Sequence, residues 1–322
     1  MDNTLHQRHR AVTPVRASKR KTRGVRVPVT ALHLMLLPAA LVIFIYNYLP
    51  MLGIVIAFQE YDVGKGISAF WRSDWVGLGN FMRLFGNPDF GRALRNTLMI
   101  AILKMTVGFI VPITIAVLLN EVRRTAVKRT IQTMIYLPHF ISWIILAGLV
   151  KDIFGMDGVV NSTLNRLFGV EPRIWLGENL SFLVILIGSN LWKEFGFNTI
   201  VYLAAITSID PNLYEAAIVD GASRLKQTWH ITLPGMRPII VLTGVLALGG
   251  ILNAGFDQIF NLYSVPVYNV ADVIETLAFR VGFQGGDYSF GAAVGLFNST
   301  IAMALITASY WMAKRFANYE IF

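Results

Sequence analysis

The chain contains six apolar stretches, each about as long as a helix that crosses a bilayer, separated by polar segments. They cover residues 31–55, 97–119, 131–151, 181–206, 237–257 and 289–312. A transmembrane helix needs about 20 consecutive apolar residues, whereas the strands of a membrane β-barrel show short alternating patterns. These stretches are continuous, so the pattern predicts six transmembrane helices. Polar residues interrupt the fourth stretch, and Gly249, Gly250 and Asn253 shorten the fifth.

The basic residues of the polar segments indicate how the six helices are oriented. An even number of spans places both termini on one side of the membrane, with the segments that follow the second and fourth spans. That side holds 17 of the 28 Lys and Arg residues, eight of them in residues 1–28, and the opposite side holds nine. Basic residues concentrate in cytoplasmic loops. We therefore expect both termini, residues 1–28 and 314–322, in the cytoplasm.

Composition agrees with a membrane protein and excludes several other classes. Charged residues make up 15% of the 322 residues, where a soluble domain has about 25%. The apolar run from Ala31 to Phe58 exceeds the roughly 7 to 15 residues of a signal-peptide core, so we expect a retained first helix. There is no cysteine, which excludes disulfides and thiolate metal sites. The basic tail favours lipid headgroups over nucleic acid, and the five histidines lack the spacing of metal ligands.

Residues typical of helix ends occur in the segment between the fourth and fifth stretches. Asp210 and Pro211 fit the cap and first position of a helix that we expect to run to about Asp220, where Gly221 permits a left-handed turn. Ser223 can cap a second short helix, which we expect Pro234 to close. The segment, residues 207–236, has about 30 residues, whereas connections in helical bundles usually have about 2 to 8. Its length favours a docking surface built of two short helices at a near-perpendicular bend.

Within this segment the residues resemble a motif of ATP-driven importers. The sequence reads Glu215-Ala216-Ala217, three residues, Gly221, nine residues, Ile231, one residue, and Leu233-Pro234. This is similar to the EAA motif of binding-protein-dependent ABC importer permeases, in which the loop forms a coupling helix that sits in a cleft of the ATPase subunit. The resemblance implies that the residues coupling this chain to the ATPase are Glu215, Ala216, Ala217, Gly221, Arg224, Ile231, Leu233 and Pro234.

The resemblance covers residues 30 to 316. Residues 75–81, 93–98 and 136–138 are similar to sugar-importing members. Phe256–Phe260 and Tyr268–Thr276 are similar to members that handle oligosaccharides and polysaccharide fragments, and the overall pattern is most similar to the first permease subunit of Gram-negative alginate importers. It implies an all-α type I ABC importer permease fold. Residues 29–92 would form the first transmembrane helix and a periplasmic loop, and residues 93–313 the permease core with its coupling loop.

The same resemblance implies the partners of the chain. The family works in the bacterial inner membrane with a second permease subunit, which we expect to be a homologous but different chain. Two ATPase subunits hold ATP and Mg²⁺, a periplasmic solute-binding protein delivers the substrate, and no cofactor is expected on this chain. We expect no contact with nucleic acid.

Polar side chains inside the fourth and fifth stretches are candidate substrate contacts. A charge at the centre of a transmembrane helix costs about 2.5–3.5 kcal/mol on insertion scales. Amides and aromatic rings together suit sugars, and Lys193 can neutralise an anionic one. The predicted substrate pathway comprises Asn190, Trp192, Lys193, Asn198, Asn253, Asp257 and Gln258. The alternative to substrate contact is that these groups bond to neighbouring helices or to a partner subunit. Lys104 is expected to snorkel or to bond between helices.

Motifs of catalysis do not occur in the sequence. No G-x-x-x-x-G-K-[ST] run is present, so we expect another chain to hydrolyse ATP, and neither G-x-S-x-G nor H-E-x-x-H occurs. The expected function is a non-catalytic permease subunit that moves an oligosaccharide or polysaccharide, alginate among the candidates, by alternating access. An ABC permease for another solute is one alternative. An ion-coupled secondary transporter is another, which would show paired repeats and broken helices and would need no docking loop.

Overall fold

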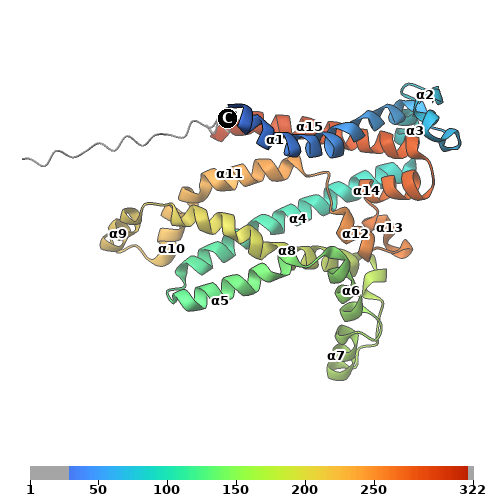
Figure 1. Ribbon diagram of the computed structural model, residues 1–322. Coiled ribbons are helices and arrows are strands. Elements are labelled where there is room, and N and C mark those ends of the chain that lie inside the picture. Colours follow the sequence, from blue (N-terminus) through green and yellow to red (C-terminus); the bar gives the residue numbers. More distant parts are fainter. Residues whose placement is uncertain (1–28, 318–322) are drawn as a thin grey trace, which may run out of the picture. The chain divides into compact units, whose positions relative to one another are not determined.

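The computed structural model describes residues 29–317 (Figure 1). The predicted basic tail, residues 1–28, and residues 318–322 of the predicted C-terminal segment lie outside the described residues. The described part is nearly all helical, which confirms the predicted class. Two short antiparallel strands, β1 (Gln59–Glu60) and β2 (Asp74–Trp75), interrupt it. The chain divides into two units, Met1–Leu52 and Gly53–Phe322, and each is described by itself.

The first unit contains most of the first apolar helix. It is built from α1 (Val29–Ile43), a π-helical turn η1 (Phe44–Tyr48) and the start of a 3₁₀ segment η2 (Leu49–Phe58), which continues into the second unit. Residues His33–Phe58 are long and apolar enough to cross a membrane, in agreement with the predicted span 31–55. Side chains such as Met35 and Tyr46 are about three-quarters exposed, as lipid-facing side chains are.

Long helices form the body of the second unit. They are α4 (Pro88–Glu121), α5 (Thr125–Tyr136), α6 (Trp143–Phe154), α8 (Asn179–Thr207), α11 (Leu233–Gly249) and α15 (Tyr288–Ala317). Within residues 29–317, five helices are long and apolar enough to span a membrane, and one bent pair can supply a sixth span. The six-span prediction is therefore consistent with the described residues. Helix α8 packs against both α4 and α11, and α11 packs against α15.

The third predicted span is not one straight helix. Helix α5 and the 3₁₀ turn η4 (Leu137–Phe140) meet α6 and α7 (Val159–Phe168) at a bend of 99°. The backbone is extended at Ile141 and Ser142, and the Ser142 hydroxyl caps α6 by accepting from the Ile145 N–H. Pro138 also removes a backbone donor just before the break. The expectation of a continuous helix over residues 131–151 was wrong for these reasons.

The fifth span begins and ends earlier than predicted. Helix α10 (Arg224–Gln227), a π-helical turn η6 (Thr228–Thr232) and α11 form one helix over Arg224–Gly249. Pro234 lies in the first turn of α11 and does not close a short helix, so that expectation was wrong. The π-helical turn before Pro234 is wider than an α-helical turn, so the proline ring does not clash with the preceding turn. The missing proline N–H then leaves no helical hydrogen bond unmade. The chain leaves the helix at Gly250, so residues 251–257 are not part of the span.

Shorter elements connect the long helices. They are η3 (Val63–Ser68), α2 (Ala69–Arg72), α3 (Gly79–Gly86), η5 (Trp175–Gly177), α9 (Pro211–Val219), α12 (Phe256–Leu262), η7 (Val265–Val267), α13 (Tyr268–Ala271), α14 (Ile274–Leu277) and η8 (Ala278–Gln284). Within the second unit, α9 and α10 lie at one end of the long helices and α12 to α14 lie toward the other (Figure 1).

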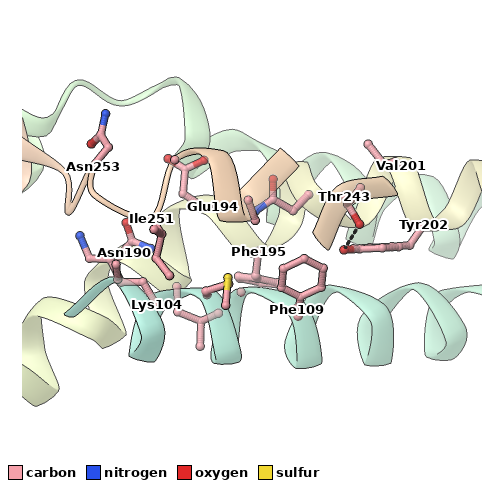
Figure 2. A pocket seen from close by; sticks show the side chains of 17 residues that line it. Lys104, Phe109, Asn190, Glu194, Phe195, Val201, Tyr202, Thr243, Ile251 and Asn253 are labelled. Carbon is pink, nitrogen blue, oxygen red and sulfur yellow. Dashed lines mark hydrogen bonds between the residues drawn. The ribbon is translucent and has the colours of Figure 1, made fainter. Parts of the chain in front are cut away.

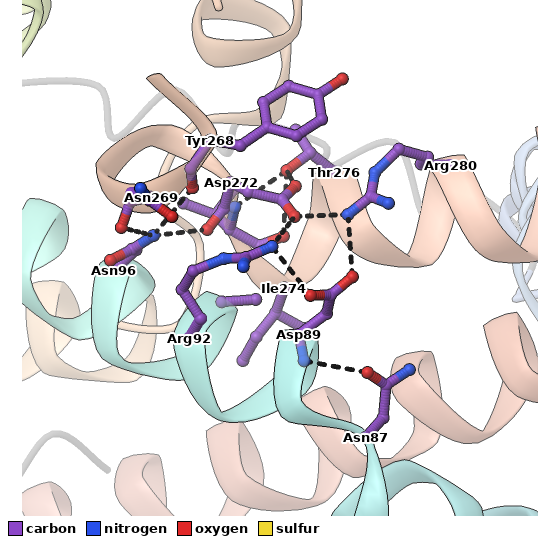
Figure 3. A network of polar contacts seen from close by, with 12 residues as sticks. Asn87, Asp89, Arg92, Asn96, Tyr268, Asn269, Asp272, Ile274, Thr276 and Arg280 are labelled. Carbon is purple, nitrogen blue, oxygen red and sulfur yellow. Dashed lines mark hydrogen bonds and ion pairs between the residues drawn. The ribbon is translucent and has the colours of Figure 1, made fainter. Parts of the chain in front are cut away.

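The α13–α14 segment is fastened to the start of α4. The Asn96 amide donates to the backbone carbonyls of Asn269 and Asp272, each at 3.0 Å, and the Thr97 hydroxyl accepts from the Ile274 N–H at 2.9 Å. Both side chains are fully buried. Because these bonds use backbone groups that no regular helix would satisfy, the irregular segment keeps a defined position against α4 (Figure 3).

Candidate functional site

Helix α9 forms because local signals begin and end it. The Asp210 carboxylate accepts from the Asn212 N–H at 3.0 Å, and Pro211 opens the first turn, as expected. Gly221 follows the last turn at φ +74°, a left-handed conformation that glycine adopts without strain. The Ser223 hydroxyl then caps α10 through the Lys226 N–H. The two helices of the coupling segment, residues 207–236, are therefore separated by a turn set at Gly221.

Three side-chain contacts hold the coupling segment in place. The Tyr214 hydroxyl lies 3.0 Å from the Thr232 hydroxyl, which joins α9 to η6. The Gln227 amide donates to the Ala222 carbonyl at 2.9 Å, across the turn. The Arg224 guanidinium lies 3.3 Å from the Glu121 carboxylate at the end of α4. These contacts give the segment a defined conformation, unlike a flexible loop.

The coupling segment exposes several large apolar side chains, interspersed with charged ones. Val219 is 87% exposed, and Leu213, Ile218, Leu225 and Trp229 are each more than half exposed. Glu215, Ala216 and Pro234 are exposed, and Ala217, Ile231 and Leu233 are half-buried. Large apolar side chains gathered on a surface mark interaction sites. Small side chains at Ala216 and Ala217 allow another surface to approach closely.

A cavity of about 330 Å³, whose largely apolar wall carries several polar side chains, lies between α4, α8, α11 and residues 250–253 (Figure 2). Three of the predicted substrate-pathway residues line it, namely Asn190, Asn198 and Asn253. Its wall also carries Lys104, Phe109, Glu194, Phe195, Tyr202 and Thr243. The Tyr202 and Thr243 hydroxyls lie 3.1 Å apart and bridge α8 to α11. Amides, hydroxyls and aromatic rings around one space suit a polyhydroxylated ligand.

The other four predicted residues lie elsewhere. Trp192 lines a separate apolar groove between α6, η5 and α8. Asp257 is exposed on α12, and its backbone carbonyl accepts from the Asn261 amide. Gln258 is 1% exposed and donates to the Leu186 carbonyl and the Ser189 hydroxyl. Lys193 is also buried and is not in the cavity wall. For Gln258 and Lys193 the structure therefore shows the interhelical bonds that the sequence left open.

Lys193 is the buried member of a partly exposed cluster at the break between α5 and α6. Its ammonium donates to the His139 carbonyl and lies 3.4 Å from the Glu194 carboxylate. The His139 ring contacts the same carboxylate at 2.8 Å and stacks on Phe197 at 3.9 Å between centroids. A side chain at Gly196 would clash with the Ile135 carbonyl, since a Cβ there would lie 1.8 Å from it. The broken span is thus fixed directly to α8.

Sequence reasoning missed Lys104, Phe109, Tyr202 and Thr243 as residues of the cavity wall. Lys104 carried a signal, since a charge inside an apolar stretch needs a reason, but its neighbours could not be read from the chain. The other three look like ordinary packing residues of apolar helices. Among residues 29–317, no group of three or more His, Asp or Glu side chains has the arrangement of a metal site.

Comparison with known proteins places these features in one family. Residues 108–318 match the family described as "Binding-protein-dependent transport system inner membrane component". Protein LplB of Bacillus subtilis is 42% identical over 292 residues, which cover 90% of this chain and 91% of that protein. The polygalacturonan/rhamnogalacturonan transport system permease protein YteP of the same organism is 41% identical over 291 residues, 90% of each chain.

Two solved structures share the fold. A chain of a bacterial ABC transporter involved in the import of the acidic polysaccharide alginate is 41% identical, with a TM-score of 0.81 over 89% of this chain and 96% of that one. A chain of a bacterial alginate ABC transporter in complex with an alginate pentasaccharide-bound periplasmic protein is 40% identical, with a TM-score of 0.82. It covers 91% of this chain and 96% of that one.

Proposed function

The chain belongs to the inner membrane components of binding-protein-dependent transport systems, and we propose that it imports oligosaccharides of acidic polysaccharides by ATP-driven alternating access. It is a multi-pass inner-membrane permease of the sugar-transporting group. The proposal adds the energy source, the acidic substrate class and the partners. These are a second, homologous permease subunit, two ATPases that hold ATP and Mg²⁺, and a periplasmic binding protein.

One observation carries the proposal. The coupling segment is continuous with α8 on one side and with α11 on the other, and both helices line the cavity. Asn198 and Tyr202 lie on α8, and Thr243 lies on α11. A displacement of α9 by a partner would therefore move two walls of the cavity directly. A loop that merely joins two spans would need neither an exposed apolar face nor a fixed turn.

Mechanically, the exposed face of α9 would receive the movement of the ATPase pair. Closure of that pair on ATP would favour one arrangement of α8 and α11, and hydrolysis would release it, which is a population shift between two states. The sequence lacks a nucleotide-binding loop, which supports a non-catalytic role for this chain. In this proposal Glu215 would pair with a basic group of the ATPase, and the small side chains of Ala216 and Ala217 would allow close approach.

The substrate class rests on chemistry and on likeness together. Asn190, Asn198 and Asn253 offer amides to sugar hydroxyls, and Phe109 and Phe195 offer aromatic surface in the same cavity. One solved neighbour belongs to a transporter of an acidic polysaccharide, and one relative is named for polygalacturonan and rhamnogalacturonan. Alginate oligosaccharides are the first substrates to test.

The test is ATP hydrolysis by the complete complex in liposomes, stimulated by its binding protein loaded with acidic or neutral oligosaccharides. We expect stimulation and uptake with acidic oligosaccharides. Glu215→Lys should weaken binding of the ATPase, whereas Glu171→Gln, at an exposed position far from α9 in the sequence, should not. No stimulation by any sugar would refute the substrate class. Undiminished ATPase binding by Glu215→Lys and Gly221→Pro variants would refute the docking role.

A further inference from the structure

We propose that Lys104 is the residue that reads the carboxylate of an acidic sugar in the cavity. The inference rests on the proposed function and names the side chain that would confer its preference for anionic substrates. Lys193, the cation that the sequence favoured for this role, is buried outside the cavity wall, whereas Lys104 is part of that wall.

Lys104 lies well inside α4, the longest helix of the described residues, where an uncompensated charge is expensive. Its ammonium donates to the Ala254 carbonyl at 2.7 Å and to the Gln258 side-chain oxygen at 2.6 Å. An ammonium has three donors, and within residues 29–317 these two neutral oxygens are the acceptors that it contacts. One donor is therefore available to a ligand in the cavity.

The position of the ammonium is set by its supports. Gln258, which accepts from Lys104, donates in turn to the Leu186 carbonyl at 2.7 Å and to the Ser189 hydroxyl at 2.9 Å. These bonds tie the lysine on α4 to α12 and to α8. Because the residues that bond to the Lys104 ammonium are themselves held by hydrogen bonds, the ammonium loses little conformational entropy when a ligand binds. Preorganisation of this kind favours specific recognition.

Glycine at position 255 is needed for this arrangement. A Cβ at Gly255 would lie 3.0 Å from the Lys104 ammonium nitrogen, and the residue has φ +92°. Any other residue would crowd the charge and strain the turn. The glycine therefore leaves the ammonium next to the backbone of the segment that closes the cavity.

Among the described residues, no nearby carboxylate forms an ion pair with the Lys104 ammonium. Glu194 lines the same cavity, but its oxygens are engaged by His139 at 2.8 Å and Lys193 at 3.4 Å. Glu275 and Glu194 both act on Lys104 electrostatically, yet no carboxylate in the described part of the chain lies within ion-pair distance of the ammonium. A ligand carboxylate would be the first direct anionic partner, and charge-assisted bonds of this kind are about twice as strong as neutral ones.

The position of Lys104 in the cavity suits a sugar that is bound at two points. Lys104 and Asn190 lie toward one end of the cavity, and Tyr202 and Thr243 lie toward the other (Figure 2). A uronate unit could place its carboxylate at Lys104 while hydroxyl groups contact the amides of Asn190 and Asn253. Neutral sugars would offer the ammonium only hydroxyl oxygens, which bind it more weakly than a carboxylate does.

The experiment compares uptake by the complete complex in liposomes, with its binding protein saturated by each sugar. The sugars are a uronate oligosaccharide and the same oligosaccharide with its carboxyl groups reduced to alcohols. Lys104→Gln should lower uronate uptake about 10- to 100-fold, the range expected for a hydrogen bond to a charged group, and should leave uptake of the reduced sugar at its wild-type level. Lys104→Arg should retain most uronate uptake, and Lys151→Gln, which removes an exposed lysine outside the cavity, should change neither.

The outcomes separate this inference from the proposed function. Unchanged uronate uptake in Lys104→Gln would overturn the inference, and so would an equal loss of both sugars, which would indicate a structural role for the bonds to Gln258. A wild-type complex that imports the neutral sugar as well as the acidic one would also overturn it while leaving the importer intact. A wild-type complex that imports neither sugar would refute the proposed function itself.

Discussion

The Arg224 guanidinium lies 3.3 Å from the Glu121 carboxylate, so the coupling segment touches the end of α4 as well as continuing into α8 and α11. Both side chains are largely exposed, and such an ion pair contributes about 0–1 kcal/mol. The pair is therefore weak enough to open when α9 moves. All three long helices of the cavity wall are reached from this one segment, so the proposed coupling of ATP hydrolysis to the cavity would act on each of them.

Gly221 should be required for its backbone conformation and not for space. It has φ +74°, and a Cβ built there meets no atom within 4 Å. Gly221→Ala should therefore cost about 1–2 kcal/mol through left-handed strain alone and should tilt α9 relative to α10. We expect weaker association with the ATPase and lower stimulated hydrolysis.

The matched control is Gly91→Ala, because Gly91 lies inside α4 and also has open space around its Cβ position. Alanine is favoured over glycine within a helix by about 1 kcal/mol. Association of both variants with the ATPase can be measured by co-purification. Equal association of the two variants would contradict the conformational role of Gly221.

The crossing of α5 and α8 should depend on Gly196. A Cβ there would lie 1.8 Å from the Ile135 carbonyl oxygen, which is backbone and cannot rotate away. Gly196→Ala should force the two helices apart, disturb the contact between His139 and Glu194, and lower the thermal stability of the purified subunit. Overpacking of this kind costs about 1–3 kcal/mol or more.

Gly188→Ala on the same helix is the control for that substitution, because nothing lies within 4 Å of its Cβ position. Both variants can be compared by thermal unfolding in detergent under identical conditions. If Gly188→Ala lowers the melting temperature as much as Gly196→Ala does, the close approach at Gly196 is not what stabilises the bend.

Local signals were readable from the sequence, whereas contacts between distant segments were not. Asp210, Pro211, Gly221 and Ser223 each act within a few residues, and the structure confirms all four roles. Pro234 does not break the helix because a π-helical turn precedes it. That turn could not be predicted from the sequence. The break at Ser142 looked like the interior of a span because its neighbours are apolar on both sides.

The cavity wall could be predicted only in part, for the same reason. Asn190, Asn198 and Asn253 stand out as amides in apolar helices, and they do meet in the cavity. Whether Lys104 or Lys193 faces that cavity depends on how α4, α8 and α12 pack. The polarity of a single side chain cannot distinguish the two lysines, because either one could have been paired inside the bundle.

The stability of the fold should respond to pH through Glu275. Burial raises the pKa of its carboxyl above the ordinary value, although Lys104 and the Phe256 N–H act in the opposite direction. A raised pKa in the folded state means that ionisation opposes folding. The penalty is absent below the unfolded value of about 4.5, grows as the pH rises from there to the folded pKa, and is constant above it.

Glu275→Gln removes the ionisation and should therefore stabilise the subunit increasingly as the pH rises above about 4.5, until the folded pKa is passed. Thermal unfolding across this range measures the difference from the wild-type chain. Glu171→Gln, at an exposed position, should give a difference that does not grow with pH. A Glu275→Gln advantage that shrinks as the pH rises would contradict the direction of the pKa change.

Asp272 should be the ion-pair residue whose loss costs the fold most. Its side chain is fully buried and lies 2.5 Å from the Arg280 guanidinium and 3.9 Å from that of Arg92, and the Thr276 hydroxyl donates to it at 2.8 Å (Figure 3). Removing its charge leaves Arg280 and Arg92, which are 27% and 30% exposed, with Asp89 as their remaining carboxylate, so we expect a loss toward the lower part of the about 3–5 kcal/mol that broken buried pairs cost. Asp272→Asn should therefore detach the α13–α14 segment from α4.

Asp287 provides a control with similar geometry and different burial. Its carboxylate lies 2.6 Å from the Arg83 guanidinium, but both side chains are partly exposed, at 30% and 56%. Asp287→Asn keeps an oxygen that can accept from the Phe290 N–H and should cost about 1 kcal/mol or less. Hydrogen exchange should show faster exchange at Ile274 in Asp272→Asn alone, because the Thr97 bond to that N–H depends on the fastened segment. Equal exchange in the two variants would show that burial of the Asp272 pair does not hold this segment in place.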